Sequence, residues 1–515
     1  MVLNQSRHRA LYRGLEILPG VLVWITFISA VLGSAIVPTW VGFFAIVYYI
    51  YWLLKVIYLS IHLATAYRTM RQRLKTNWVV KLANLHPKTW QKTLPGLKFS
   101  HDLWHVVALP MYQEGFEILR ETLLALSRTN YPKQRLIVGL GVEARAGEAD
   151  QAVAQALQKE FAGQFGYFVV ATHPANLAGE VAGKGSNETW LARQIYKNVI
   201  QKNKIPVEHI TYSALDSDTQ LDPGYFSLLT YQFLTASAPH QQSYQPVAFF
   251  SNNIWQAPAI ARVVAFSSTY WNIIQQERPH RQLTFSSHSM SFKTLVAVDF
   301  KVTNAVSDDS RIFWQCFFAF KTHYAVASLY FPAHMDANVA KTFWRTMRNQ
   351  YLQQRRWAWG ASDLAYAGTG LKSLWPELNL KQRWHGLKRL TAAAAGYYSW
   401  ATSSLLIFFL GWLPSWFGGP AYNQTVFSYN LPQITQTLAL IASLAIILQV
   451  FITLQVLPPK PPQYGRHRYI LMVLQWLLLP ITMNLLGAVP AIDAQTRLML
   501  GQRLGFWPTE KHRKK

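Results

Sequence analysis

The chain has 515 residues, of which 51% are apolar, 14% are aromatic and only 14% are charged, and 20 of them are tryptophan. This composition excludes an ordinary soluble enzyme of several domains and places part of the chain in a membrane, while the single cysteine, Cys316, excludes a disulfide framework and a cysteine-rich zinc site. The net charge of +25 suits anionic lipid headgroups or phosphorylated ligands, and nucleic acid is not an expected partner because no recognition motif is present.

Five apolar runs have the length of about 20 residues that is needed to cross a bilayer. They cover residues 15–37, 40–63, 391–417, 433–457 and 469–490. All five are predicted to be transmembrane helices. The first run is too long for the core of a signal peptide and a second run follows it at once, so we expect it to be retained.

Basic residues beside these runs predict their orientation, because lysine and arginine in short loops stay on the cytoplasmic side. They occur before the first run, after the second run and between the last two runs, as Arg7, Arg9, Arg13, Arg68, Arg71, Arg73, Lys75, Lys460, Arg466 and Arg468. The N-terminus and the large segment after the second run should therefore be cytoplasmic. Five crossings would place the basic tail outside. Pro480 offers an alternative, in which the last run forms a re-entrant or two-part element.

Residues 78–390 have the composition of a soluble α/β domain. Short apolar, β-branched runs occur at residues 105–110, 135–141, 167–172 and 209–216, and they alternate with helical patterns at residues 117–128 and 188–200. The alternation predicts a parallel sheet that is covered by helices on both faces. Ligands of such sheets bind outside the carboxyl ends of the strands, so the residues after each strand are candidates for a site.

The stretch "ALDSDTQLDPG" places Asp216 and Asp218 directly after an apolar strand. Two carboxylates that flank one residue in a tight turn can hold a hard divalent cation such as Mg²⁺ or Mn²⁺, which in turn can bind a diphosphate. The alternative is a pair of solvated turn acids. The position at the end of a strand favours the metal site.

Three further stretches place charged residues at comparable positions. Glu114 follows the first strand and could accept hydrogen bonds from a nucleoside, whereas Lys184 lies between glycines before a helix, a position that suits phosphate. Asp308 and Asp309 form a like-charge pair in which one pKa can be raised toward use as a general base. Each has a structural alternative, as a helix N-terminal acid, a surface lysine or a helix cap. Their occurrence together favours a catalytic site.

The stretch "QQRRW" contains Gln353, Arg356 and Trp357. Together with the preceding motifs it resembles the membrane-embedded glycosyltransferases of family 2, which include cellulose, chitin and hyaluronan synthases. The resemblance covers residues 103–359 and the tail. In processive members the Q-x-x-R-W pattern lies on an interfacial helix beneath the acceptor channel. The arginine can pair with the donor's diphosphate, and Gln353 and Trp357 can contact the acceptor. An ordinary interfacial helix rich in Arg and Trp is the alternative.

The resemblance implies a role for each earlier candidate. Glu114 becomes part of the nucleotide pocket, and Lys184 becomes a phosphate contact. Asp216 and Asp218 become the carboxylates for metal and diphosphate. Asp309 becomes the general base, although this chain has "SDD" where the family usually has Thr-Glu-Asp.

Three stretches depart from the family pattern or extend it. "FSSHSMSFK" stands where the family has a small-residue loop near the acceptor, and His288 is a departure there. The tail "FWPTEK" resembles the F-x-V-T-x-K gating loop of cellulose synthases, with proline in place of valine, and it implies gating by Phe506, Thr509 and Lys511. The acid commonly found after the second strand is absent, and Glu143 is the only nearby substitute.

The fold that the resemblance implies is an α/β, Rossmann-like domain of the glycosyltransferase A type, inserted between transmembrane α-helices and facing the cytoplasm. The expected segments are 1–75 with two transmembrane helices, 76–335 with the glycosyltransferase domain, 336–390 with interfacial helices, 391–490 with three apolar runs, and 491–515 with a basic cytoplasmic tail. The expected location is the plasma (inner) membrane.

The activity that the resemblance implies is inverting, metal-dependent hexosyl transfer with Mg²⁺ or Mn²⁺. The donor would be a nucleotide-diphosphate sugar, with a UDP-sugar first among candidates, and the transfer would elongate a polysaccharide whose path lies between the transmembrane helices. Expected partners are this donor, a glycan or lipid-linked acceptor, and membrane lipids. Two alternatives stay open, namely a non-processive enzyme that transfers one sugar to a lipid carrier and a catalytically inactive scaffold of a polysaccharide secretion complex.

Overall fold

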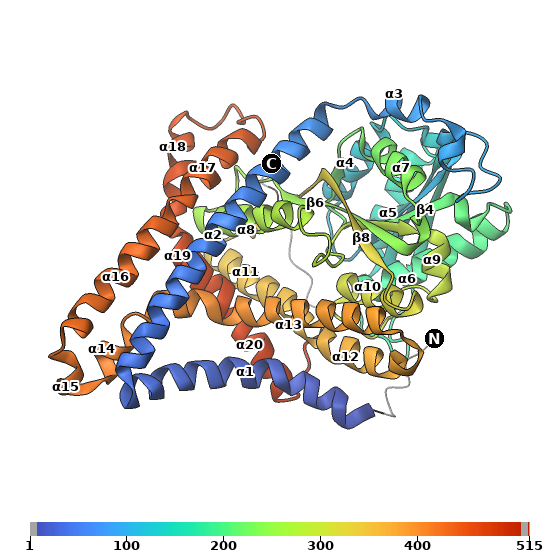
Figure 1. Cartoon of the computed structure of the whole chain (residues 1–515). Coiled ribbons are helices and arrows are strands. Elements are labelled where there is room, and N and C mark those ends of the chain that lie inside the picture. The colour runs from blue at the N-terminus through green and yellow to red at the C-terminus, as the bar shows by residue number, and fades with distance from the viewer. Residues whose placement is uncertain (1–7, 506–512, 514–515) are drawn as a thin grey trace.

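The computed structural model describes residues 8–505 and residue 513, which form an α/β domain and a group of long helices (Figure 1). The helices up to the end of the α/β domain are α1 (Arg9–Ile36), α2 (Pro38–Lys75), α3 (Trp78–Ala83), α4 (Phe116–Ser127), α5 (Glu148–Phe161), α6 (Lys184–Ile195), α7 (Tyr225–Thr235), α8 (Ala259–Gln276), α9 (Phe292–Ala297) and α10 (Asp308–Ala319). The later helices are α11 (Phe343–Ala358), α12 (Asp363–Leu374), α13 (Leu380–Phe409), α14 (Leu413–Phe417), α15 (Gly419–Asn423), α16 (Val426–Ser443), α17 (Ala445–Val456), α18 (His467–Leu474), α19 (Leu479–Met483) and α20 (Val489–Met499).

One eight-stranded sheet, with the order β3-β2-β1-β4-β7-β6-β8-β5, forms the centre of the α/β domain. The strands are β1 (Trp104–Met111), β2 (Leu136–Glu143), β3 (Tyr167–His173), β4 (Ile210–Ala214), β5 (Gln220–Leu221), β6 (Gln242–Phe250), β7 (His288–Ser291) and β8 (Ala325–Met335). The four predicted strands are confirmed as β1 to β4, and they are mutually parallel. An all-parallel sheet is wrong, because β7 runs antiparallel to β4 and β6. The mixed sheet confirms the glycosyltransferase A-type fold class.

The sheet separates two apolar cores, because side chains alternate between its faces along each strand. In β1, Val107, Leu109 and Met111 join the core that includes α4, α5 and α7. Val106 and Ala108 join the opposite core, which includes α6, α9 and α10. The parallel strands are therefore buried on both faces, and the polar groups that do chemistry are left at their carboxyl ends.

Four segments among the described residues are long and apolar enough to cross a membrane. They are Arg9–Ile36, Pro38–Lys75, Val426–Val456, in which α17 continues α16, and His467–Met499, which joins α18 to α20. The predicted run at residues 391–417 does not form one helix, because α13 ends at Phe409 and the separate helix α14 follows. The first turns of α13 are polar, and α13 lies outside this set of four.

α13 and the α16–α17 segment extend between the α/β domain and the turn that joins α1 to α2. α13 packs against α12 and α1, and near its end Tyr49 of α2 donates a hydrogen bond to the carbonyl of Ile407. α16 begins near the same turn and runs beside α2 (Figure 1). Just after the end of α17, the Trp255 indole donates to the carbonyl of Pro458, 3.0 Å away.

The last apolar segment follows a different path and is not one regular helix. A 3₁₀ turn at Gln475–Leu478 and a π turn at Asn484–Ala488 interrupt it, and Pro480 lies in the first turn of α19 between them. α18 packs against α17, the 3₁₀ turn and α19 pack against α8, and α20 packs against α11 and α1. The part of the segment after α18 therefore contacts helices that adjoin the α/β domain.

Candidate active site

The Asp-x-Asp turn lies at the carboxyl end of β4, next to the end of β1. The turn is closed by a 2.9 Å hydrogen bond from the Thr219 amide to the Asp216 carbonyl. Ser217 Oγ donates to Glu114 Oε1 at 2.8 Å, and the amide of Tyr112 donates to the other oxygen of the same carboxylate. Glu114 therefore supports the turn from the end of β1, at the edge where the sequence places the ligand.

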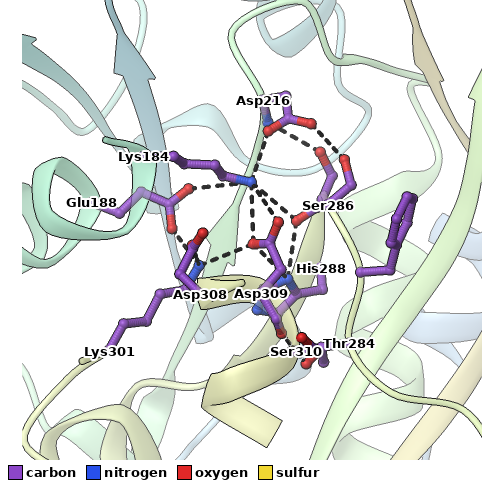
Figure 2. Close-up of polar contacts among 12 residues, drawn as sticks. Lys184, Glu188, Asp216, Thr284, Ser286, His288, Lys301, Asp308, Asp309 and Ser310 are labelled. Atoms are coloured by element: carbon purple, nitrogen blue, oxygen red, sulfur yellow. Dashed lines mark hydrogen bonds and ion pairs between the residues drawn. The ribbon is translucent and has the colours of Figure 1, made fainter. Parts of the chain in front are cut away.

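The carboxylate of Asp216 points into a polar cluster that comes from several elements (Figure 2). Its Oδ1 lies 2.7 Å from Lys184 Nζ, and its Oδ2 accepts a hydrogen bond from Ser286 Oγ. Its backbone amide donates to Ser287 Oγ at 3.1 Å. The segment before β7 thus fixes the orientation of Asp216. This is the segment that stands where the family has its small-residue loop.

Asp218 is more deeply buried than Asp216 and lies beside a further carboxylate. It is 4% exposed, and its Oδ2 accepts a 3.1 Å hydrogen bond from the amide of Asp336, which is itself 7% exposed. The guanidinium of Arg513 binds Asp336 at 2.7 and 3.0 Å and also contacts Glu121. Burial alone would lower the pKa of Arg513, but its contact with Asp336 outweighs burial and raises the pKa.

This part of the site offers carboxylate oxygens of the kind that a divalent cation prefers. Asp216, Asp218 and Asp336 offer hard oxygen donors, which Mg²⁺ and Mn²⁺ prefer. Arg513 already compensates part of their negative charge. Asp216 is also bound by Lys184, so a cation there would share this carboxylate with an ammonium group.

A second acidic group, made of Glu188, Asp308 and Asp309, has carboxylate oxygens within 4.8 Å of one another. Its cation position is filled by Lys301, which is 3% exposed. The Lys301 ammonium lies 2.5 Å from Glu188, 3.1 Å from Asp308 and 3.2 Å from Asp309. A metal ion there would have to displace a buried lysine, so we assign the charge balance of this group to Lys301.

Lys184 connects the two acidic groups. It is the first residue of α6, after Gly183, and its Nζ lies 3.2 Å from Asp309 and 3.6 Å from Glu188 in addition to Asp216 (Figure 2). Burial alone would lower its pKa, but these carboxylates outweigh burial and raise the pKa well above the ordinary value of lysine. Lys184, the predicted phosphate contact, is therefore charged. It lies between Asp216 of the Asp-x-Asp turn and Asp309, the predicted base.

Asp308 and Asp309 begin α10, but they occupy different environments. Asp308 is buried and packs so closely on Gly185 that a β-carbon there would lie 2.6 Å from it. Burial and the adjacent Asp309 raise the pKa of Asp308. Burial would also raise the pKa of Asp309, but Lys184 and Lys301 outweigh it and lower the pKa. The expected raised pKa thus falls on Asp308, whereas the more exposed Asp309 is an ionised carboxylate that faces the cavity.

His288, the departure from the family loop, lies directly beside the predicted base. Its ring is fully buried, and its Nδ1 lies 3.1 Å from the carbonyl of Ser286 and 3.9 Å from Asp309 Oδ1. Burial lowers the pKa of His288 to about 3, and Lys301 acts in the same direction. The imidazole is therefore neutral and fills the space behind Asp309 without adding charge.

The "QQRRW" stretch forms the last turns of α11, and its two arginines face different neighbours. Arg355 Nη1 binds Asp493 of α20 at 3.0 Å, which joins α11 to the last apolar segment. Burial lowers the pKa of Arg356, while the site carboxylates act in the opposite direction, with Asp216 the strongest. Trp357 packs between Phe250 and Phe285, with ring centroids 5.9 and 5.5 Å away.

These groups share one cavity of about 2090 Å³. Of the residues predicted for the donor, base and acceptor, its lining includes Glu114, Lys184, Asp216, Asp218, Asp309, Gln353, Arg356 and Trp357. The cavity continues between α1, α2, α13, α16 and α19, where its walls become apolar and aromatic. The predicted gating residues Phe506, Thr509 and Lys511 lie outside the described residues.

Four residues of the site were not correctly predicted from the sequence. One of them, Glu143, has a different partner from the one expected, and the other three were not predicted. Glu143 lines the cavity, but its carboxylate is bound by Arg145 at 2.6 Å. Lys301, Asp336 and Ser286 were not predicted. Asp336 carried a usable signal, because it follows an apolar strand just as Asp216 does. Lys301 lies in a loop with no motif, so only its burial among carboxylates reveals it.

Residues 213–456 match the sequence model of the glycosyl transferase family group 2, a match that includes the Asp-x-Asp turn, α10, α11 and the helices up to α17. The chain therefore carries a glycosyltransferase domain. No functionally curated protein matches it. Its structure is similar to mannosyltransferase PcManGT from Pyrobaculum calidifontis in complex with GDP-Man and Mn²⁺, at 11% identity and a TM-score of 0.40, over 88% of this chain and 99% of that chain. It is also similar to residues 1–349 of TarS from S. aureus in complex with UDP-GlcNAc, at 11% identity and a TM-score of 0.32, over 65% of this chain and 92% of that chain.

Proposed function

We propose that this chain, a glycosyltransferase with a domain of the family 2 type, is an inverting, metal-dependent enzyme that transfers a sugar from a nucleotide diphosphate to a hydroxyl of a growing glycan at the membrane. The observation that carries the proposal is the single cavity that joins Asp218, Lys184 and Asp309 to the aromatic space between the long helices. A donor, a base and an acceptor can meet there without rearrangement of the sheet.

The chemistry needs a base on one side of the anomeric carbon and positive charge on the other. Asp309 would accept the proton of the acceptor hydroxyl as its oxygen attacks, since this carboxylate is ionised and faces the cavity. Lys184 and Arg356 would neutralise the departing diphosphate. Asp216 and Asp218, with Asp336 beside them, would hold Mg²⁺ or Mn²⁺, which when bound supplies further positive charge to the diphosphate.

Glu114 and Trp357 would hold the two substrates. Glu114 lies at the end of β1, where its carboxylate can accept hydrogen bonds from a nucleoside while it supports the Asp-x-Asp turn. Trp357 offers an indole surface that is held in place by two phenylalanine rings, so a sugar can stack on it at little entropic cost. Gln353, one helical turn before Trp357, would donate or accept hydrogen bonds at the acceptor.

The long helices would place the domain at the cytoplasmic side of the membrane. α1, α2, α13 and the α16–α17 segment each extend between the domain and the α1–α2 turn, so four crossings would leave the N-terminus and the loop after α17 on the domain's side. The last segment, which contacts α8, α11 and α1, would lie in the interface as a re-entrant element. This arrangement keeps every basic loop on one side and removes the conflict that five crossings create.

The test is a screen of radiolabelled UDP- and GDP-sugars with the full chain in nanodiscs, in the presence of Mg²⁺ or Mn²⁺. We expect one donor to give nucleotide release and a labelled product, and Asp309→Asn to lose the transfer. Sizing of the product distinguishes a polymer from the addition of one sugar to a lipid carrier. Failure of every donor to react would contradict the enzymatic proposal and favour the inactive scaffold.

A further inference from the structure

Three cationic residues outside the candidate active site line the same cavity. They are Lys55, in the apolar part of α2, and Arg278 and Arg281, in the segment that follows α8. We refer to these three residues as the Arg278 cluster. None of them forms an ion pair with the carboxylates of the candidate active site, so the proposed transfer leaves their charge without a role.

Arg278 is buried without a counter-charge. Its side chain is 6% exposed, and its Nε has no hydrogen-bond partner. Among residues 8–505 and 513, no carboxylate pairs with it. Burial lowers the pKa of Arg278, and the charge of Arg281 lowers it further. A buried cation in this condition is costly unless an anion joins it.

Arg311 shows how the same chain buries a guanidinium when no ligand is involved. It is also 6% exposed, but its Nε lies 2.7 Å from Asp363 Oδ1. Burial alone would lower the pKa of Arg311, yet the Asp363 carboxylate outweighs burial and raises it. The missing carboxylate beside Arg278 therefore distinguishes this cluster from a structural ion pair.

The groups around Arg278 are hydrogen-bond donors and aromatic rings. Gln275, one turn earlier at the end of α8, has a buried Nε2 without a partner. The guanidinium lies 5.9 Å from the ring of Tyr58 and 6.0 Å from that of Trp271, and Lys55 Nζ lies 4.0 Å from the ring of Trp52. Arg278 forms a side-chain hydrogen bond with Tyr58, but this neutral hydroxyl supplies no counter-charge and leaves Nε without a partner. Guanidinium, ammonium and amide donors suit a phosphate oxygen.

The cluster adjoins the surface that the long helices present to the bilayer. On α2, Leu54, Ile57 and Ile61 are 61%, 49% and 60% exposed, and Trp271 beside Arg278 is 52% exposed. An apolar chain can lie along these side chains while a phosphate reaches the buried guanidinium. A phosphate from solution would leave this apolar surface uncovered.

We propose that Lys55, Arg278 and Arg281 bind the phosphate headgroup of a membrane lipid that enters the cavity from the bilayer. This site goes beyond the transfer proposed above, because the donor's diphosphate would be held by Lys184 and Arg356. It places an anionic lipid within the cavity that leads to Asp309, and its binding does not depend on a nucleotide sugar.

Native mass spectrometry of the full chain in detergent tests this site. The probes are phosphatidic acid, phosphatidylcholine and inorganic phosphate. We expect phosphatidic acid to be retained, and Arg278→Gln or Lys55→Gln to weaken its binding about tenfold or more, the size expected for the loss of a charged hydrogen bond. Lys55→Gln is the second variant because Arg278 is buried and its replacement can disturb folding. Arg71→Gln, which removes an exposed arginine from the same helix, is the matched control and should bind as the native chain does.

Two results would overturn the proposal. Equal binding of phosphatidic acid by the native chain and by a folded Lys55→Gln or Arg278→Gln variant would place the lipid elsewhere. Displacement of the lipid by an equal concentration of inorganic phosphate would assign the cluster to a soluble anion. A chain that binds the lipid but reacts with no nucleotide sugar would contradict the proposed transfer alone.

Discussion

Lys184 Nζ lies 2.7 Å from Asp216 Oδ1, so one ammonium group is held by a carboxylate of the Asp-x-Asp turn. If the same ammonium is to contact a diphosphate, the charge of Asp216 must be balanced in another way. A divalent cation at Asp216 and Asp218 provides this balance. The geometry therefore links metal binding to donor binding, and it makes the role of each charge testable.

The first prediction concerns the metal. Asp218→Asn should remove a cation ligand and abolish transfer, and excess chelator should do the same to the native enzyme and weaken donor binding. Transfer and donor affinity are measured with and without Mn²⁺. Asp222→Asn, which changes an acid of the same loop, is the control and should keep its metal dependence. Full activity of Asp218→Asn would exclude a metal role for Asp218.

The second prediction concerns the base and its pH dependence. Asp309→Asn should lower turnover by about 10² to 10⁴, with donor binding little changed. The pKa of Asp309 is lowered from the ordinary aspartate value of 3.8. Asp309 therefore stays ionised as the pH falls to 3.8 and is protonated only at lower pH. Lys184→Met removes a cation 3.2 Å away, so the acid limb of the pH–rate profile should move to higher pH.

Asp308→Asn separates this role from a structural one. Asp308 is bound to the buried Lys301, so its replacement should reduce thermal stability more than Asp309→Asn does. Stability and turnover are measured on the same preparations. A large loss of turnover for a stable Asp308→Asn, together with a small loss for Asp309→Asn, would move the base to Asp308.

The third prediction compares neighbouring residues of α11. Arg356→Ala should cost roughly 2 to 4 kcal/mol of donor binding, because it removes one of the two proposed cationic side chains from the diphosphate in a partly desolvated site. Arg355→Ala, the matched control, should lower stability through its lost contact with Asp493 but keep donor affinity. Trp357→Ala should spare donor hydrolysis and shorten the product. Unchanged product length for Trp357→Ala would contradict the acceptor role.

The fourth prediction concerns Arg513, which lies beside the carboxylates of the proposed metal site. Its guanidinium binds Asp336, whose amide donates to Asp218. Arg513→Ala should therefore raise the affinity for Mn²⁺, since a competing positive charge is removed. The activation of transfer by Mn²⁺ is titrated in both forms. A weaker response of the variant to Mn²⁺ would indicate that Arg513 supports the metal site.

The fifth prediction concerns topology. Leu500 follows α20 and is 60% exposed, whereas Tyr429 of α16 is 81% exposed near the α1–α2 turn. In a Cys316→Ser background, a cysteine at position 429 should react with an impermeant thiol reagent outside intact cells, and a cysteine at position 500 should not. Labelling of position 500 from outside would show that the last segment crosses the membrane.

Composition and local patterns predicted the membrane segments, the strands β1 to β4 and the acids at the strand ends. These features depend on composition and on local alternation, which short stretches of chain carry unaided. Asp216 and Asp218 could be found because the carboxyl ends of parallel strands meet at one edge of a sheet. The antiparallel β7 could not, since a strand of four residues, "HSMS", carries no apolar alternation and is stabilised by its neighbours.

The environment of each charged group depends on contacts between segments that are far apart in the sequence. Asp308 and Asp309 are adjacent in the sequence, yet their pKa values shift in opposite directions, and the side chain of Asp309 is 22% exposed whereas that of Asp308 is 4% exposed. Arg355 and Arg356 are neighbouring residues of the same type. Their contacts differ because successive residues point to different sides of a helix. Partners from distant parts of the chain set these environments, so no local pattern could reveal them.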